Sequence, residues 1–588
     1  MQEIFLGVNS EPVDPSVAIV KDGKVLAYAE EERFIRNKHA NGVYPIHALE
    51  YCLDFAGVSI RDITNVAVAW NLPHYTDGTI KSFYESLRNK WPVDSNTLSW
   101  QSRMLQFHDC EYHHNFHRSN CRRVFGDINF PPLYPLPHHY VHAFHSFMQS
   151  RFEKAVCITI DGSGDKHCTV IWHCEGNRIQ PIREIFMPHS LGWFYAAFTE
   201  YLGFRAYDGE YKVMGLAAYG RPDSEILSRM KQIIYPADDG VEYLLDPSYI
   251  YYGPHTYSNR FTDKMVELFG RKPRLHAEKI TEWHEDLAFA VQKKLEDFVE
   301  RLILWAIRET GVNNICIGGG VGLNIKMNSR IFQLPDISDV FAHPLCNDAG
   351  TAVGAALAAC FQTTNKRPEI LSTLALGPDE SDDKIENTLK RVNIKYEKSI
   401  DICEAVAEEL VNGRIIGWFQ GRMEAGPRAL GQRSILADPR YVENRDKVNA
   451  IIKFREYWRP FCPSVTEEAM NKYFEEYTES PFMIVSFKAN DRLKSDAPAI
   501  VHIDGTSRVQ MVKKDVLPLY YKLITAFEKR TGVPVLLNTS FNIKGEPIVC
   551  TIQDALRTFW STGLDVLAIG NCLINKHKMN IYDGSLSC

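Results

Sequence analysis

The sequence of 588 residues lacks the features that mark membrane-bound and secreted proteins. It contains no run of 18 apolar residues, and its first residues, MQEIFLGVNSEPVD, combine neither a basic segment nor a long apolar one. None of its 14 cysteines forms a C-x-x-C pair, and most lie in apolar contexts, which indicates reduced residues in a protein core. We therefore expect a cytoplasmic protein without a membrane span.

The sequence also lacks an excess of positive charge. Its 66 lysines and arginines face 73 aspartates and glutamates, which gives a net charge of -7. This balance provides no overall attraction to nucleic acid or to an anionic membrane, so we expect neither as a partner. With 45% hydrophobic residues, the chain can form the cores of roughly two to four domains of an enzyme-sized protein.

Cations are nevertheless concentrated in one part of the chain. Residues 421–440 and 452–465 carry seven of them, whereas the whole stretch from 421 to 465 offers five carboxylates. Gly426, Pro427 and Gly431 indicate a shaped turn, so we expect part of this charge to bind a phosphate or carboxylate ligand. The alternative is a solvated basic loop with local ion pairs. The cations are Arg422, Arg428, Arg433, Arg440, Lys453, Arg455 and Arg459.

Two predicted hairpins indicate a duplicated α/β unit. Each combines apolar, β-branched runs with a tight turn that contains Asp and Gly. The strands of the first hairpin and the one before it are expected at 4–8, 17–20 and 25–29, and those of the second at 155–160 and 168–172.

Helical and glycine-rich segments follow. An apolar stripe predicts a helix over residues 285–310, ended by Gly311. A strand at 314–317 then runs into the segment GGGVGLN at 318–324, whose backbone N–H groups can approach a phosphate, although a crowded turn needs the same glycines. A further helix is expected over 349–363, and a polar connector after it marks a domain boundary.

Histidines form a second unusual cluster. Eight of the 20 histidines fall between residues 108 and 145. His138 and His142 are four residues apart, so on a helix they share a face and can bind one metal ion, as could His139 with His142 or His145 in a less regular arrangement. Asp161 and Asp348 lie in turns that can bring carboxylates to the same point, and such a set suits a divalent transition metal. The alternative is a group of core or surface histidines bonded to the backbone.

Together these segments resemble the O-carbamoyltransferases of the nodulation protein NodU and tobramycin carbamoyltransferase type, along almost the whole chain. The resemblance implies an α/β protein with two domains. Residues 1–368 would form a threonylcarbamoyl-transferase-like domain with the duplicated actin/hexokinase-like fold, and residues 369–588 a YrdC-like domain. The segments that carry the resemblance lie at 27–39, 138–147, 158–165, 208–220, 318–324, 347–357, 421–440 and 537–542.

The resemblance also implies a reaction in two stages. Carbamoyl phosphate and ATP, used with Mg2+, give carbamoyl-adenylate, and a small-molecule alcohol then accepts the carbamoyl group near a metal, Fe2+ or another divalent ion. The metal ligands would be His138, His142, Asp161 and Asp348. The nucleotide site would contain Lys212, Gly319, Gly320 and Asn324, and the carbamoyl phosphate and adenylate site would contain Arg428, Lys453, Arg459, Arg508 and Ser540.

One position departs from the family pattern. Related proteins carry a His-Asp pair after the first strand, whereas this chain has Val13 and Asp14. A valine cannot accept a proton, so Asp14, His139 or a group on the metal would do so, or proton removal is not the difficult step. Arg428 and Lys453 complete the expected catalytic set.

Two other functions remain alternatives to transfer onto a small-molecule natural product. One is a threonylcarbamoyl-transfer enzyme that modifies tRNA, which the acidic charge balance disfavours. The other is a non-catalytic, actin-like nucleotide-binding protein. The sequence does not identify the acceptor, and a homodimer is left open; residues 74–137, rich in aromatic residues and histidines, either form a wall of the acceptor pocket or pack this insertion onto its domain.

Overall fold

The computed structural model describes all residues except 1–2, 11–12, 253–259, 457 and 580–588. The chain forms two compact units. The first contains residues 1–27 and 41–370, and the second contains residues 28–40 and 371–588. The division expected from the sequence falls at residue 368, and the units differ from it chiefly because segment 28–40 belongs to the second unit.

The first unit contains two five-stranded sheets with the same topology. Their orders are β3-β2-β1-β4-β5 and β8-β7-β6-β11-β12. Strand β1 runs antiparallel to β2 and parallel to β4. In the same way, β6 runs antiparallel to β7 and parallel to β11. The duplicated α/β fold is therefore confirmed. The strands are β1 (Ile4–Asn9), β2 (Ser16–Lys21), β3 (Lys24–Glu30), β4 (Asn65–Val68), β5 (Leu133–Pro135), β6 (Lys154–Gly164), β7 (His167–Glu175), β8 (Arg178–Phe186), β11 (Asn314–Gly318) and β12 (Asp339–Ala342).

The predicted turn between β2 and β3 has a specific backbone conformation. Asp22 and Gly23 both have positive φ, 54° and 79°. A two-residue hairpin turn with this conformation matches the twist of the flanking strands, and Asp-Gly favours it.

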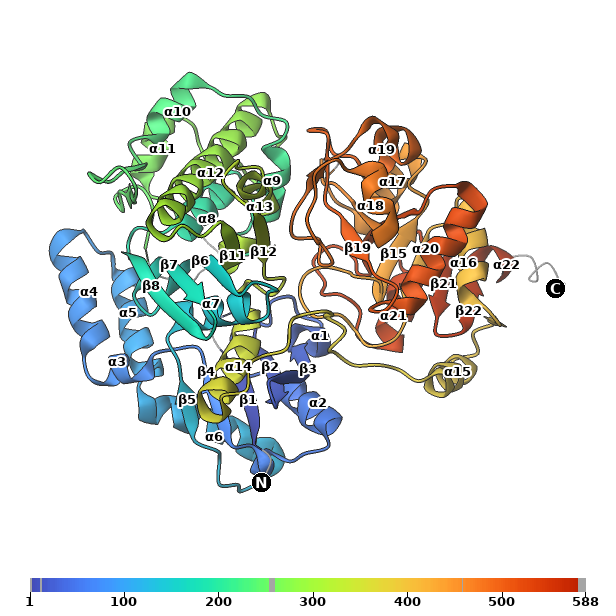
Figure 1. Cartoon of the computed structure of the whole chain (residues 1–588), viewed down its shortest axis with the longest axis horizontal. Coiled ribbons are helices and arrows are strands. Elements are labelled where there is room, and N and C mark those ends of the chain that lie inside the picture. The colour runs from blue at the N-terminus through green and yellow to red at the C-terminus, as the bar shows by residue number, and fades with distance from the viewer. Residues whose placement is uncertain (1–2, 11–12, 253–259, 457, 580–588) are drawn as a thin grey trace. The chain divides into compact units, whose positions relative to one another are not determined.

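Two buried helices lie beside the predicted metal ligands: α7 (His138–Met148) carries His138 and His142, and α14 (Thr351–Thr364) begins shortly after Asp348. Helix α7 packs against β6 and β11, and α14 packs against β1, β2, β4 and α7 (Figure 1). A Cβ atom on Gly7 of β1 would lie 1.8 Å from the carbonyl oxygen of Ala352, so this close approach requires glycine. The predicted long helix is also confirmed as α12 (Glu282–Thr310), which ends at Gly311 with φ of 66°.

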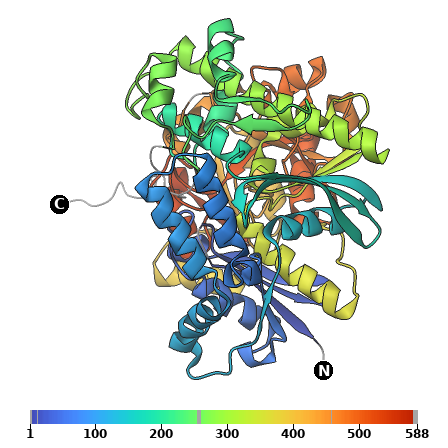
Figure 2. The same cartoon turned by 90° about the vertical axis from the view of Figure 1, so that its left-hand side faces the viewer.

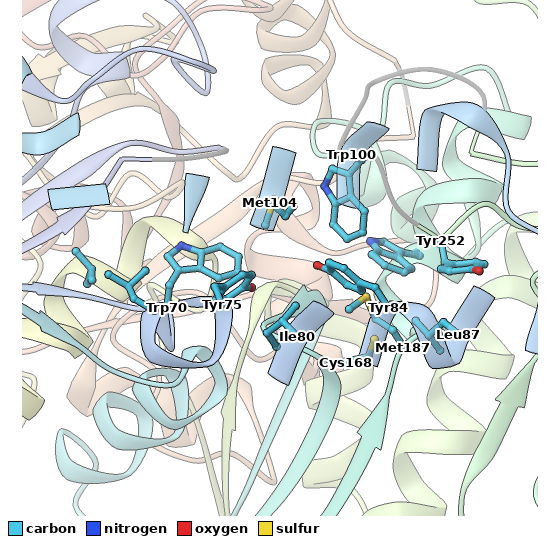
Figure 3. Packing of buried hydrophobic residues seen from close by; sticks show 13 residues of the cluster. Trp70, Tyr75, Ile80, Tyr84, Leu87, Trp100, Met104, Cys168, Met187 and Tyr252 are labelled. Carbon is cyan, nitrogen blue, oxygen red and sulfur yellow. The ribbon is translucent and has the colours of Figure 1, made fainter. Parts of the chain in front are cut away.

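Four helices are inserted between β4 and β5, and they face the viewer in Figure 2. Trp70, Tyr75, Tyr84 and Trp100 of this region form a buried cluster with Cys168 of β7 (Figure 3). Trp193 of α8 belongs to the same cluster. These aromatic side chains therefore pack the insertion onto the unit. The inserted helices are α3 (Leu72–Thr76), α4 (Thr79–Lys90), α5 (Ser95–Phe107) and α6 (Cys110–Phe125).

Smaller elements complete the first unit. They are α2 (Ile46–Ala56), α8 (Leu191–Tyr201), α9 (Glu210–Leu216), α10 (Ser224–Met230), β9 (Ile234–Pro236), β10 (Tyr243–Leu245), α11 (Asp263–Phe269) and α13 (Ile325–Phe332).

The second unit is also α/β and is built on an eight-stranded sheet of order β13-β22-β21-β14-β15-β20-β16-β19. Its likeness to YrdC remains a prediction. The strands are β13 (Glu397–Lys398), β14 (Ile416–Phe419), β15 (Arg433–Ala437), β16 (Cys462–Thr466), β19 (Gln510–Val512), β20 (Val535–Ser540), β21 (Val566–Ile569) and β22 (Cys572–Asn575), with β17 (Phe487–Lys488) and β18 (Thr506–Ser507) in a separate pair.

The helices of this unit include α1, formed by the N-terminal segment. They are α1 (Glu32–Ile35), α15 (Asp382–Arg391), α16 (Ile402–Val411), α17 (Val442–Val448), α18 (Met470–Tyr473), α19 (Asp491–Asp496), α20 (Pro518–Thr531), α21 (Ile552–Trp560) and α22 (Lys576–Met579). Across the described part of the chain, none of the helices is both long and apolar enough to cross a membrane.

Candidate metal centre and anion site

The structure brings together the four side chains predicted to bind a metal. His138 and His142 project from successive turns of α7, and their Nε2 atoms are 3.1 Å apart. Asp161 of β6 places Oδ2 3.7 Å from His138 Nε2 and 3.3 Å from His142 Nε2. Asp348, just before α14, places Oδ1 3.6 Å and 3.7 Å from the same two atoms. One ligand atom from each residue lies within 4.8 Å of all the others.

The electrostatics of this cluster favour a bound cation. Burial lowers the pKa of His138, but the carboxylates of Asp161 and Asp348 outweigh that effect and raise the pKa to about 9. Burial and the charge of Asp161 raise the pKa of Asp348. Asp348 Oδ1 is buried without a hydrogen-bond partner. Two imidazoles and two carboxylates fit a divalent transition metal, which would supply the missing positive charge.

Neighbouring groups orient His138. Its Nδ1 atom lies 3.3 Å from the carbonyl oxygen of Ala69, and donation to this oxygen leaves Nε2 as the ring nitrogen that can bind a metal ion. The backbone N–H of His138 donates to Asp165 Oδ2 at 3.0 Å, and Asp165 Oδ1 accepts from the N–H of Asn71 at 3.0 Å. Asp165 thereby fixes the start of α7. A Cβ atom on Gly164 would lie 2.1 Å from Cδ2 of His138, so the imidazole occupies the space that glycine leaves.

The glycine-rich segment lies directly beside this centre. The N–H of Gly320 donates to Asp161 Oδ2 at 3.1 Å, and Gly319 has φ of 80°. Asn324 caps α13, and its side-chain amide forms two reciprocal hydrogen bonds with Gln292 of α12, at 2.9 Å and 3.0 Å. Lys212 is buried on α9, which packs against α12. Nucleotide binding by Lys212, Gly319, Gly320 and Asn324 remains a prediction.

The two residues expected to accept a proton have different surroundings. His139 has partners at both ring nitrogens, because Nδ1 lies 2.9 Å from the hydroxyl of Thr159 and Nε2 lies 3.2 Å from the carbonyl oxygen of His167. Asp14 accepts a hydrogen bond of 2.8 Å from the side chain of Asn347, the residue before Asp348. A role of either residue as proton acceptor remains a prediction.

The second unit buries a lysine among oxygen acceptors. Lys453 ends a π-helical turn, Asn449–Lys453, and its side chain is 4% exposed. Its ammonium donates to the backbone carbonyl oxygens of Ser540 and Asn542, to Ser540 Oγ at 3.1 Å and to Asn542 Oδ1 at 2.6 Å. Burial, together with the charges of Arg455, Arg459 and Lys38, lowers the pKa of Lys453 well below its usual value.

Besides Lys453, arginines among the seven cations of the basic segment also have partners within the second unit. Arg433 is fully buried and donates to the carbonyl oxygens of Gln420, Gly421, Gln432 and Pro378, so it is a structural residue. Local pairing, the alternative for this segment, is therefore correct in part. Others are Arg422, which donates to Leu376 and Gly377, Arg440, which pairs with Asp438, and Arg455, which donates to Asn449.

The turn that carries Arg428 is held at both ends. Glu424 Oε1 accepts from the N–H groups of Leu430 and Arg433, at 2.7 Å and 3.2 Å. Gly426 and Gly431 have φ of 83° and 103°, which confirms the shaped turn. Arg428 is half-buried within this turn.

Arg508, which lies outside the basic segment, contacts the eight-stranded sheet of the second unit. Its Nε donates to Cys462 Sγ at 2.7 Å, and Cys462 of β16 pairs with Asn538 of β20, the strand that ends at Ser540. Anion binding by Arg428, Lys453, Arg459, Arg508 and Ser540 remains a prediction.

Sequence reasoning assigned no role to Asp165 or Gln292, and it did not place segment 28–40 in the second unit. Asp165 ends the acidic, glycine-containing turn at 161–165, and that composition is the signal for a special position. Gln292 gave no local signal, and the motif at 27–39 carried the resemblance without showing its contacts, because the partners of both are distant in the sequence.

Comparison with known proteins identifies the family. A family model described as the carbamoyltransferase N-terminus matches residues 5–357, and one described as the carbamoyltransferase C-terminus matches residues 407–576. The chain therefore belongs to the carbamoyltransferase family.

Relatives include proteins with named functions. The nodulation protein NolNO of Sinorhizobium fredii is 35% identical over 97% of this chain and 80% of its own length. The 3'-hydroxymethylcephem-O-carbamoyltransferase of Amycolatopsis lactamdurans is 34% identical over 43% of this chain and 47% of its own. Among solved structures, HypF from T. kodakarensis aligns with 62% of this chain and 48% of its own, with 12% identity and a TM-score of 0.32.

Proposed function

We propose that the chain is an O-carbamoyltransferase that forms carbamoyl-adenylate from carbamoyl phosphate and ATP, and transfers the carbamoyl group to a hydroxyl of a small-molecule natural product. Family membership supports the transfer of a carbamoyl group. The observation that carries the finer proposal is the buried Lys453 of one unit, whose pKa is lowered by burial and by the charges of Arg455, Arg459 and Lys38. The other unit holds the cluster of His138, His142, Asp161 and Asp348.

The first stage makes the adenylate at the anion site. Water cleaves carbamoyl phosphate to carbamate and phosphate, a carbamate oxygen attacks the α-phosphorus of ATP, and pyrophosphate leaves. Both leaving groups carry negative charge, which Arg428, Lys453, Arg459 and Arg508 would neutralise. Ser540 Oγ accepts from Lys453 and donates to Asn542 Oδ1 at 2.7 Å, and it would donate to a phosphate oxygen in place of Asn542.

The second stage breaks the bond between the carbamoyl carbon and the oxygen of AMP. The oxygen of the acceptor alcohol forms the new bond, AMP leaves, and Asp14 would take the hydroxyl proton. A divalent metal, Fe2+ or another ion, held by His138, His142, Asp161 and Asp348 would supply Lewis acidity. Gly320 donates to Asp161, and Asp165 fixes the start of α7, so the chain holds the ligand set in place before the substrate arrives.

The first stage can be tested without an acceptor. Pyrophosphate release from ATP is measured with and without carbamoyl phosphate, for the wild type, Arg459→Ala and Arg445→Ala. Arg445 is a matched control because it is a half-buried arginine of α17 that pairs with Asp446.

We expect release that depends on carbamoyl phosphate in the wild type and in Arg445→Ala, with a loss of at least roughly 100-fold in Arg459→Ala. Absence of release from wild-type protein loaded with metal would contradict the two-stage reaction. Equal release from both variants would contradict the assignment of Arg459.

A further inference from the structure

Residues 69–71 connect β4 to the inserted helix α3 and lie against the predicted metal ligand His138. The carbonyl oxygen of Ala69 is 3.3 Å from His138 Nδ1. The ring of Trp70 lies beside the imidazole of His138, with the ring centres 5.2 Å apart. Ala69 and Trp70 are both buried. The entry to the inserted helices therefore forms part of the surroundings of His138.

Asp165 joins this connection to α7 through both of its carboxylate oxygens. Oδ1 accepts from the backbone N–H of Asn71, the N-cap residue of α3, at 3.0 Å. Oδ2 accepts from the backbone N–H of His138, the first residue of α7, also at 3.0 Å. The first N–H groups of a helix have no partner within it, and a negative charge beside them is favourable. One buried carboxylate thereby holds the start of the insertion and the start of α7 together.

The backbone at Asp165 limits the residue types that could make both contacts. Asp165 lies in the turn between β6 and β7 and has φ of 54°, a conformation that glycine, asparagine and aspartate tolerate best. Glycine offers no side-chain acceptor, and asparagine offers one oxygen where Asp165 uses two. The turn alone is compatible with all three residue types, so the two contacts, and not the turn, account for a carboxylate at this position.

Trp70 extends the connection into the insertion. Its ring stacks on His108, with the ring centres 4.2 Å apart. His108 is the C-cap residue of α5, and the ring centre of Tyr75 on α3 lies 4.9 Å from that of His108. All three rings are buried. Because buried side chains are closely packed, a displacement of α3 or α5 moves Trp70 and, with it, the groups that hold His138.

We propose that Asp165 is a positioning residue that couples metal binding at His138 to the conformation of the inserted helices α3–α6. Metal binding then stabilises the attachment of the insertion, and detachment of the insertion weakens metal binding by the same factor, because linkage is reciprocal. The inference rests on the metal site of the proposed function and not on its two reaction stages. It assigns the insertion a role in metal loading, in addition to its packing.

The first test measures metal affinity without substrates. Co2+ is titrated into the metal-free full chain of the wild type, Asp165→Asn and Asp223→Asn, and its visible absorption reports both binding and ligand geometry. Asparagine keeps the size of the side chain and tolerates positive φ, but its amide group cannot accept a second N–H. Asp223 is a matched control, because one of its oxygens, Oδ1, accepts from both N–H groups that it caps on α10, at 2.8 Å and 2.9 Å.

We expect Asp165→Asn to bind Co2+ at least about 10-fold more weakly than the wild type and with a changed absorption spectrum, since groups that orient a metal ligand contribute roughly 10- to 100-fold to affinity. Asp223→Asn should match the wild type in both. Equal affinities and spectra of Asp165→Asn and the wild type would overturn the inference. An equal loss in both variants would do the same, as would a wild type that binds no Co2+.

Hydrogen exchange of the wild type tests the coupling without any substitution. If α3 detaches only when His138 releases the metal, Co2+ at about 100 times its Kd slows exchange of the α3 amides by up to about 100-fold and leaves those of α10 unchanged. The slowing should be lost in Asp165→Asn at the same saturation. Exchange of α3 that does not respond to Co2+ in the wild type would overturn the coupling, whatever the affinity of the variant.

Neither measurement uses carbamoyl phosphate or ATP. Coupled Co2+ binding in a protein that releases no pyrophosphate would therefore support the role of Asp165 and contradict only the proposed adenylation.

Discussion

Acidification from pH 7.5 to 5.5 is expected to destabilise the first unit through two histidines on the inserted helix α6. The Nε2 atoms of His113 and His117 are 3.3 Å apart. His113 Nδ1 lies 3.1 Å from the carbonyl oxygen of Phe107, and His117 Nδ1 lies 3.0 Å from the hydroxyl of Tyr44. Burial lowers the pKa of His113 to about 4 and that of His117 well below its usual value. Both rings are therefore neutral in the folded protein at neutral pH.

The direction of this pH effect on stability follows from the pKa of His113 in the folded and unfolded states. Its pKa in the unfolded chain is about 6.5, so between that value and the folded value the unfolded chain binds the proton more strongly. The free energy of unfolding therefore falls as the pH drops below 6.5 and is unaffected well above it. At pH 5.5 the loss from His113 alone is about 1.4 kcal/mol, and it reaches about 3.4 kcal/mol below pH 4. His117 adds to it.

The assay is urea unfolding of the wild type, His113→Gln and His276→Gln at the two pH values. His276 is an exposed histidine of the same unit and serves as the control. The wild type and the control should lose about 1.4 kcal/mol more than His113→Gln between pH 7.5 and 5.5, whatever the stability of each at pH 7.5. Equal losses in all three proteins would refute the reasoning.

Two further substitutions test the candidate sites. Gly164→Ala would place a methyl group against the ring of His138, so we expect a loss of about 1–3 kcal/mol of stability and of bound metal, measured by unfolding and by metal content after dialysis against Co2+. Full metal content and an unchanged melting temperature would contradict the described packing. Arg433→Met leaves four carbonyl oxygens without their donor, and we expect the second unit to lose roughly 3–5 kcal/mol in urea unfolding. An effect below about 1 kcal/mol would show that Arg433 is not a structural residue.

Features set by local sequence were predicted well. Asp22 and Gly23 specify their turn because few residues tolerate positive φ, and the apolar stripe of α12 follows from helical periodicity. The spacing of His138 and His142 placed both on one face of α7. In each case, the residues that determine the structure lie within a few positions of one another.

Features set by distant partners were not predicted. The charge of Arg433 suggested an anion ligand, but the residue is enclosed by carbonyl oxygens from loops that the sequence does not bring together. Segment 28–40 begins within β3, a strand of the first unit's sheet, yet the segment belongs to the second unit and contacts Gly426 and Pro547 there. His139 has the same residue type as its metal-site neighbours, and only the tertiary structure shows that Thr159 and His167 bind its ring.

The central claim is that the chain makes carbamoyl-adenylate in one unit and transfers its carbamoyl group at the metal centre of the other. The most direct test is rapid quenching followed by mass spectrometry of Asp348→Asn, given 13C-labelled carbamoyl phosphate, ATP and a candidate alcohol. The account predicts that labelled carbamoyl-adenylate accumulates while no labelled product forms, because the variant lacks one carboxylate of the metal centre. Labelled product without detectable adenylate, in the variant and in the wild type, would contradict it.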